Sequence, residues 1–209
     1  MTYKKKLIEV ALPLKAINEA CVKEKTIRQG HPSTLHVYWA RRPLAAARAV
    51  LFSTLVDDPS GNKELSELEV VKERKRLFHL IEQLVLWKNT NNKDLLLQAK
   101  KEIDYSTNNN PPQLLDPFCG AGTIPLEGQK LGLESFGSDL NPLAVLITKG
   151  LIELPYKFKD CHPVNPSIKL RTDSNSNWAE STGLANDLRY YGELIKDNCY
   201  KILSKFYPK

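Results

Sequence analysis

Apolar residues recur every three or four positions along the first half of the chain, which predicts a mainly helical N-terminal region. The spacing of Leu7, Val10, Leu14 and Ile17 predicts a helix over 7–29, with Pro13 near its first turns. The Gly-His-Pro-Ser-Thr segment at 30–34 is expected to end this helix. A second helix is expected from about 42 to 55, with Pro43 in its first turn and alanines at 45, 46, 47 and 49.

Two further apolar stripes predict a charged helical hairpin between residues 63 and 103. A turn at 89–92 separates the stripes, and both are expected to serve packing rather than ligand binding. A polar, asparagine-rich connector at 106–112 follows the hairpin. The stripes comprise Leu77, Leu80, Ile81, Leu84 and Val85 in the first helix, and Leu95, Leu96, Ala99 and Ile103 in the second.

The second half of the chain begins with two short apolar strands, near 113–117 and 134–138, on either side of a helix-forming stretch. Pro142 is expected to open another helix, and residues 155–166 are interrupted by prolines and are expected to be irregular. A polar loop at 172–176 precedes a long helix over about 184–206. The apolar positions of that helix are Leu184, Leu188, Tyr191, Ile195, Cys199, Ile202 and Phe206.

This order of elements predicts an α/β protein, with a partial Rossmann-like fold preceded by a helical N-terminal region. Three parts are expected: a helical segment at 1–60 that folds back on the site, a helical hairpin insertion and connector at 61–110, and an incomplete Rossmann-like domain at 111–209. A sheet of two strands is not stable by itself. We therefore expect the chain to be the front part of a larger α/β domain.

Composition and charge say more about the cellular environment of the protein than about its function. The 209 residues are 42% hydrophobic and carry a net charge of +6, which permits a polyanionic partner without requiring one. No apolar run approaches the roughly 18 residues of a membrane span, and the start of the chain does not resemble a secretory signal. The four scattered cysteines favour neither zinc nor disulfides, so no metal site and a reducing, cytoplasmic setting are expected.

The candidate chemistry lies in a glycine turn after the first strand and an acid after the second. The turn reads Asp-Pro-Phe-Cys-Gly-Ala-Gly-Thr at 116–123, and Asp139 closes the second strand. Glycines allow backbone to approach a ligand, and a carboxylate is a natural acceptor for the two hydroxyls of a ribose. The third glycine of the dinucleotide pattern is missing, which favours S-adenosylmethionine over a nicotinamide cofactor.

Specific roles follow for the residues of this turn. Asp116 is expected to accept from the amino group of the methionine moiety or to orient the turn, and Thr123 to cap the next helix. Leu140 and Pro142 are expected to flank the adenine. The full set of candidate cofactor residues in this half of the chain is Asp116, Phe118, Gly120, Ala121, Gly122, Thr123, Asp139, Leu140 and Pro142.

These motifs resemble those of class I S-adenosylmethionine-dependent methyltransferases that act on exocyclic amino groups of nucleic acids. The run Gly-His-Pro-Ser-Thr-Leu-His-Val-Tyr-Trp-Ala-Arg-Arg-Pro-Leu at 30–44 is more specific, as is Gly-Leu-Ala-Asn-Asp-Leu-Arg-Tyr-Tyr-Gly at 183–192. Both are similar to the N-terminal region, labelled a domain of unknown function, of large prokaryotic adenine-specific DNA methylases. The resemblance covers nearly the whole chain.

The resemblance implies that a segment ahead of the glycine turn covers the methionine end of the cofactor, which makes Pro32, Ser33 and Thr34 candidate contacts. The alternative is a capped helix start without a ligand role. Arg41 and Arg42 are candidate nucleic-acid contacts beside Tyr38 and Trp39. The alternative there is that Trp39 lies in the core and the arginines pair with carboxylates; this reading is preferred for Trp39.

No catalytic residue is assigned. Amino methyltransferases of this kind use a (D/N)PP(Y/F/W) motif to hold the target amine and stack on its base. The nearest match, Asn-Pro-Pro-Gln at 110–113, lacks the aromatic residue and precedes the glycine turn, so it is interpreted as a turn before the first strand. The resemblance places the catalytic motif beyond Lys209.

The resemblance thus implies the S-adenosylmethionine-binding N-terminal portion of a DNA adenine N6-methyltransferase, of the kind found in restriction-modification systems. Double-stranded DNA with an adenine target is the expected partner, and we expect the chain alone to bind cofactor weakly and to methylate nothing. Three alternatives stay open: an RNA methyltransferase, a non-catalytic subunit completed by a second polypeptide, and a nicotinamide-dependent oxidoreductase.

Overall fold

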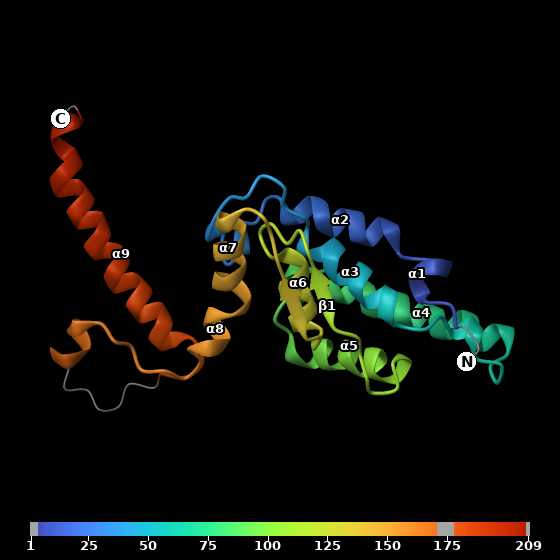
Figure 1. The fold of residues 1–209 in the computed structure, drawn as a ribbon. Coiled ribbons are helices and arrows are strands. Elements are labelled where there is room, and N and C mark those ends of the chain that lie inside the picture. Colours follow the sequence, from blue (N-terminus) through green and yellow to red (C-terminus); the bar gives the residue numbers. More distant parts are fainter. Residues whose placement is uncertain (1–3, 171–177, 208–209) are drawn as a thin grey trace. The chain divides into compact units, whose positions relative to one another are not determined.

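A computed structural model describes residues 4–170 and 178–207, and the chain forms two compact units, Met1–Ile152 and Glu153–Lys209. The polar loop expected at 172–176 lies outside the described residues. The structure is mixed α/β, mostly helical, with a small parallel sheet of two strands (Figure 1).

The first unit opens with two helices where one was predicted. Helix α1 spans Leu7–Val10 and α2 spans Leu14–Glu24. The prediction of one helix over 7–29 was wrong because the chain becomes extended at Ala11, and Pro13 takes the position before α2. Proline has no amide hydrogen to continue the first helix and is best tolerated at such a start.

The next three helices agree with the sequence pattern. Helix α3 spans Leu44–Leu55 and follows directly after Pro43, which precedes the helix rather than lying in its first turn. Helices α4 (Glu67–Leu84) and α5 (Lys93–Ser106) form the predicted hairpin, joined through the short 3-10 helix η3 (Trp87–Asn89). Another 3-10 helix, η2 (Pro59–Gly61), lies between α3 and α4.

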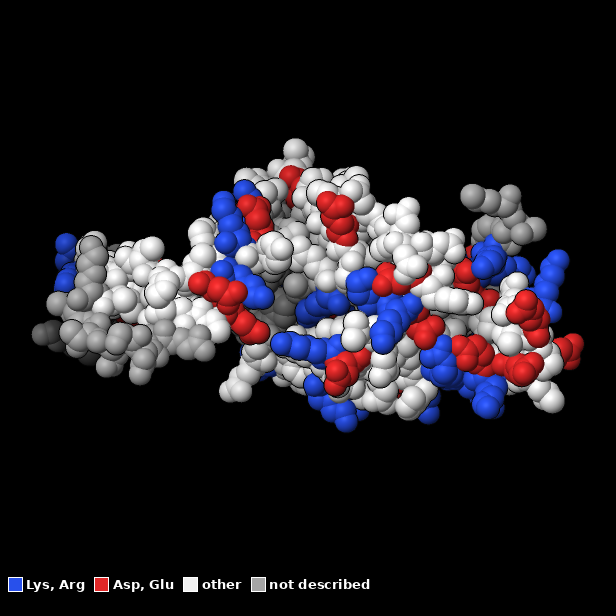
Figure 2. Space-filling model, turned by 90° about the horizontal axis from the view of Figure 1, so that it is seen from below, with Lys and Arg blue, Asp and Glu red and all other residues white. Residues whose placement is uncertain are grey.

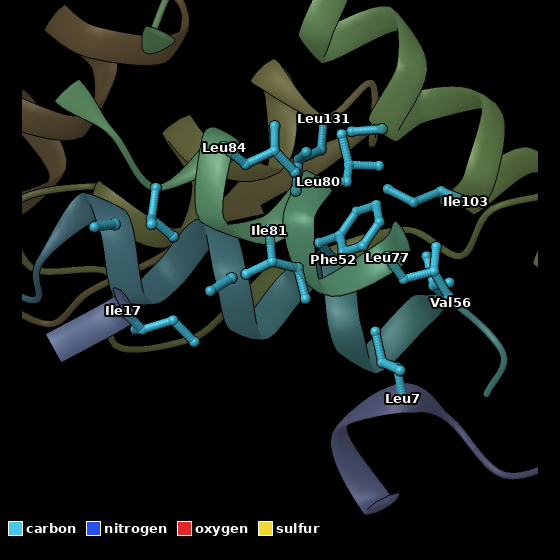
Figure 3. Close-up of a cluster of buried hydrophobic side chains, with 14 of the residues drawn as sticks. Leu7, Ile17, Phe52, Val56, Leu77, Leu80, Ile81, Leu84, Ile103 and Leu131 are labelled. Atoms are coloured by element: carbon cyan, nitrogen blue, oxygen red, sulfur yellow. The ribbon is translucent and has the colours of Figure 1, made fainter. Parts of the chain in front are cut away.

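One hydrophobic core holds these helices together. Phe52 of α3 lies among Leu77, Leu80 and Ile103, so α3, α4 and α5 meet at its ring (Figure 3). The predicted first stripe of the hairpin is buried throughout, whereas the second is buried at Ala99 and Ile103 and partly buried at its other positions. The apolar spacing therefore identified the core face of both helices correctly.

The glycine turn belongs to a strand-helix-strand unit packed on this core. Strand β1 (Leu114–Asp116) runs parallel to β2 (Ser135–Gly137), and α6 (Thr123–Lys130) connects them. In the register, Leu114 faces Ser135 and Asp116 faces Gly137, so both strands end at the same edge. Helix α7 (Pro142–Ile152) follows β2, as predicted.

A buried ion pair links α6 to the N-terminal helices. Arg48 of α3 donates through Nε to the carboxylate of Glu127 on α6, and both side chains are buried. The Nη1 atom of Arg48 also donates to the carbonyl oxygen of Leu84 at 2.5 Å, which adds the end of α4. Lys130 approaches the same carboxylate at 3.2 Å, and its burial lowers the pKa of the ammonium.

The second unit contains the helix α8 (Leu154–Lys157), the 3-10 helix η4 (Pro166–Leu170), the long helix α9 (Thr182–Leu203) and the 3-10 helix η5 (Ser204–Phe206). The long final helix was predicted correctly. The irregular segment expected at 155–166 includes most of α8, which the sequence pattern did not reveal. Asp187 of α9 accepts from the amides of Val164 and Asn165 and so ties that segment to the helix.

Within residues 4–170 and 178–207, no helix is both long and apolar enough to cross a membrane.

We predict that Glu127→Gln lowers the free energy of unfolding by about 3–5 kcal/mol, because Arg48 then stays buried without a counter-charge. Urea denaturation measures the change. Glu82→Gln is the matched control, since the Glu82 side chain is 44% exposed and lies 3.7 Å from His79, its ion-pair partner. It should stay within about 0.5 kcal/mol of the wild type. Equal effects of the two substitutions would contradict the proposed link.

Candidate functional site

The edge where β1 and β2 end brings the glycine turn against the acid of the second strand. The amide of Cys119 donates to the carbonyl of Ser138 at 3.0 Å, which extends the pairing beyond the strands. The next amide, that of Gly120, donates to Oδ2 of Asp139 at 2.9 Å. Two segments that are separate in sequence are thereby joined at the edge where ligands bind in open α/β sheets.

Asp139 is held as an ionised acceptor at this edge. Its Oδ1 atom accepts from the amide of Asn141 at 2.9 Å, while Oδ2 accepts from Gly120. These backbone hydrogen bonds, that from Asn141 first, lower the pKa of Asp139 below the ordinary carboxyl value. An ionised carboxylate has about four acceptor sites, so each oxygen keeps capacity for a ligand hydroxyl.

The other acid, Asp116, orients the start of the turn. Its Oδ1 atom accepts from the amide of Phe118 at 3.1 Å, which agrees with the second of its two predicted roles. The ring of Phe118 and the side chain of Leu140 are 85% and 99% exposed, and Pro142 is the first residue of α7. Leu140, one of the two residues expected to flank the adenine, is therefore an exposed apolar side chain.

Gly122 supplies the backbone conformation that turns the chain into α6. Its φ of 71° is left-handed, and a Cβ there would lie 2.9 Å from Oγ1 and 3.2 Å from Cα of Thr148 on α7. The helix begins at Thr123 with Gly122 in the capping position and no side-chain cap. The prediction that Thr123 caps α6 was therefore wrong, because the glycine occupies that position.

Tyr38 packs the N-terminal region directly onto the turn. Its ring is 7% exposed and lies 3.2 Å from where a Cβ on Gly120 would stand, and its hydroxyl accepts from Nδ2 of Asn141 at 3.4 Å. Trp39 stacks on Tyr38 with ring centroids 4.8 Å apart but is 77% exposed. The preferred placement of Trp39 in the core was thus wrong, and the core aromatic is its neighbour.

Residues Pro32–Thr34 form the 3-10 helix η1, which is capped by His31. The Ser33 amide donates to Nδ1 of His31 at 3.1 Å, and the Thr34 hydroxyl donates to the His31 carbonyl at 2.7 Å. The alternative of a capped helix start therefore describes the local structure of this segment. It does not remove the segment from the site, because Pro32 and Ser33 also line a pocket at the glycine turn.

Glu24 at the end of α2 holds the whole 25–43 segment in place. Its carboxylate accepts from Nε2 of His31 at 3.0 Å and from the amides of Leu44 and Ala45 at 2.9 and 3.0 Å. Since Pro43 offers no side-chain cap, Glu24 caps α3 from a different helix. Sequence reasoning missed this role. The signal that could have revealed it is the absence of a capping side chain before α3, because the first amides of the helix then need an acceptor from elsewhere.

The resulting pocket has a volume of about 250 Å³ and joins the N-terminal segment to the glycine turn. Pro32 and Ser33 line it from one side and Ala121 and Thr123 from the other. Arg41 and Arg42 line it as well, and both are exposed. The structure thus brings most of the predicted residues to two adjoining places, the pocket and the strand edge. Thr34 is exposed and is not among the residues lining the pocket.

Cys119 has a structural role in the turn. Its thiol is buried 3.3 Å from the hydroxyl of Thr148, and burial, reinforced by Asp139 and Asp116, raises its pKa. A protonated, buried thiol is a poor nucleophile. Over the described stretches of the chain, no group of three or more His, Cys, Asp and Glu side chains is arranged to hold a metal ion.

Comparisons with known proteins relate part of the chain to methyltransferases. Residues 11–80 match the family described as "Protein of unknown function (DUF1156)". The chain is also 37% identical over 75 residues to "Type II methyltransferase M.MvaI" of Kocuria varians. That similarity covers 29% of this chain and only 16% of that protein. No solved structure matches the chain. The chain therefore contains a methyltransferase-associated N-terminal region.

We predict that Glu24→Ala destabilises the first unit by about 2 kcal/mol, because α3 and His31 lose a charged hydrogen-bond partner. Urea unfolding followed by circular dichroism measures this. Glu19→Ala, at an exposed position of the same helix, should change the stability by less than about 0.5 kcal/mol. A loss no larger than that of the control would show that Glu24 does not organise the segment.

Proposed function

We propose that this chain binds S-adenosylmethionine and forms the donor-binding part of a DNA methyltransferase that acts on N6 of adenine. The observation that carries the proposal is the hydrogen bond from Gly120 to Asp139, which joins the glycine turn and the acid at one edge of a parallel strand pair. The partial Rossmann-like organisation is part of the same proposal. S-adenosylmethionine supplies an activated methyl group when bound.

The donor set of the site fits the nucleoside half of this cofactor. Asp139 is fixed by two amides and keeps acceptor capacity for the ribose hydroxyls. Phe118, Leu140 and Pro142 offer the apolar surface against which an adenine would lie. Gly120, Ala121 and Gly122 keep the backbone of the turn accessible. Asp116 is the proposed acceptor for the amino group of the methionine moiety.

The methionine half is assigned to the pocket beside the turn. Pro32 and Ser33 face Ala121 and Thr123 across it, and Thr34 is proposed as a further contact at its margin. This arrangement supports the expected covering of the cofactor by the N-terminal segment. The pocket is apolar at Pro32 and Ala121 and polar at the two hydroxyls, which suits a group that carries both methylene and charged ends.

The proposal that the reaction is methyl transfer rests on sequence similarity rather than on a catalytic residue. The relative that is 37% identical over 75 residues is named a methyltransferase. The proposal that the target is adenine in DNA rests on the resemblance of the sequence motifs. Asn110–Gln113 leads into β1 and lies before the glycine turn, so no residue of this chain is assigned to the target amine. The residues described here would bind and orient the donor only.

A second candidate is a subunit that a further polypeptide completes, and the sheet favours it. Leu115 of β1 and Phe136 of β2 are paired neighbours in the register and are both exposed. Parallel sheets normally have both faces covered. Additional strands and helices, from this protein or from a partner, would bury these side chains and would provide the acceptor side of the reaction.

We predict that S-adenosylhomocysteine binds the chain in calorimetry and that NAD does not. Asp139→Asn should weaken this binding roughly tenfold or more, because hydrogen bonds to a charged group contribute about 1.5–3 kcal/mol. Asp197→Asn, at an exposed position of α9, is the control and should leave the affinity unchanged. Tighter binding of NAD, or equal affinities of the wild type and the Asp139 variant, would overturn the proposal.

A further inference from the structure

Four cationic side chains line the pocket beside the glycine turn. Lys25, Arg28, Arg41 and Arg42 all line it, and none of them forms an ion pair within the part of the chain that the structure describes. Elsewhere basic and acidic side chains lie side by side, as on the face drawn in Figure 2. Arg76, for example, pairs with both Glu73 and Glu102.

Among the described residues that line the pocket, Glu24 is the one carboxylate, and its single negative charge can balance only one of the four positive charges. Glu24 accepts from His31 and from the first two amides of α3. The four cations are exposed, whereas the pocket residues Pro32, Ser33, Ala121 and Thr123 are half-buried. The positive charge is therefore concentrated at the exposed margin of the pocket, outside the part assigned to the methionine half of the cofactor. Such a concentration favours an anionic ligand, and guanidinium groups suit phosphate because they can donate two parallel hydrogen bonds.

An exposed aromatic side chain borders the same pocket. Trp39 lines it, and Tyr38 supports the indole from below with the ring planes inclined by 18°. Tyr38 is itself buried, packs beside Gly120 and accepts a hydrogen bond from Asn141, so the indole stacks on a ring that is part of the site's interior. An exposed tryptophan that is held flat in this way is a suitable platform for stacking a nucleobase.

Unpaired cations beside a supported indole match the alternating phosphates and bases of a nucleic-acid strand. We propose that Trp39 and the cations Lys25, Arg28, Arg41 and Arg42 bind a single-stranded stretch of DNA, with a base on the indole and phosphates on the cations. An acidic peptide would use the cations but not the ring. This inference rests on the proposed function, for which it names the surface that receives the substrate next to the donor.

The test measures binding of a labelled single-stranded DNA of about 15 nucleotides to the full chain by fluorescence anisotropy. Trp39→Ala should weaken binding roughly tenfold, because a stacked base is lost. The double variant Arg41→Ala/Arg42→Ala should also weaken binding. It should reduce the slope of log K against log salt concentration by about 1.4, which is about 0.7 for each lost phosphate contact. The controls are Tyr105→Ala, which removes a ring that is 78% exposed on α5, and Lys15→Ala on α2. Both should stay within about twofold of the wild type.

Three results would overturn the inference: no binding of the DNA by the wild type, equal losses in the control variants, or displacement of the DNA by poly-glutamate as efficiently as by unlabelled DNA. Calorimetry with S-adenosylhomocysteine on the same variants separates the two proposals. If Arg41→Ala/Arg42→Ala impairs only cofactor binding, the cations serve the cofactor and the inference fails while the proposed function stands. If DNA binding depends on Trp39 but the cofactor does not bind, the proposed function fails while the inferred DNA-binding surface stands.

Discussion

The buried ion pair between Arg48 and Glu127 fixes the glycine turn relative to the N-terminal helices. It joins α3 to α6 across the core, and the additional hydrogen bond to Leu84 includes the end of α4. Because α6 leads directly out of the glycine turn, any displacement of this helix would move the turn away from the 31–43 segment. Separating α3 from α6 would leave a buried charge without its counter-charge, which disfavours arrangements that break this pair.

A second layer of contacts converts that placement into a site. Asp139 ties the two strand ends together, and Tyr38 presses the N-terminal segment onto Gly120. Glu24 then fixes the same segment at its far end by capping α3 and holding His31. The pocket between these anchors contains the hydroxyls, the glycine-turn backbone and the unpaired cations. Donor binding and substrate binding are thus proposed for adjoining surfaces of one compact unit.

The sequence pattern predicted those elements whose formation depends on residues close together in the chain. The stripes of α4 and α5, the two parallel strands and the helix after Asp139 followed from apolar spacing and turn residues. The break before Pro13 was missed because a continuous apolar period was given more weight than the missing amide of proline. Glu24 and Tyr38 were missed for a different reason: their roles depend on partners far away in sequence. Which of Tyr38 and Trp39 is the buried ring likewise depends on which of them packs beside Gly120. The spacing of residues along the chain cannot predict that long-range contact.

The central claim is that the turn, the acid and the 31–34 segment bind one ligand together. Amide chemical shifts of the ¹⁵N-labelled chain, recorded while S-adenosylhomocysteine is added, test it most directly. The account predicts that the amides of Gly120, Gly122, Leu140 and Ser33 shift with a common dissociation constant, while those of α5 and α9 do not move. Shifts confined to other parts of the chain, or shifts of the turn without those of Ser33, would contradict it.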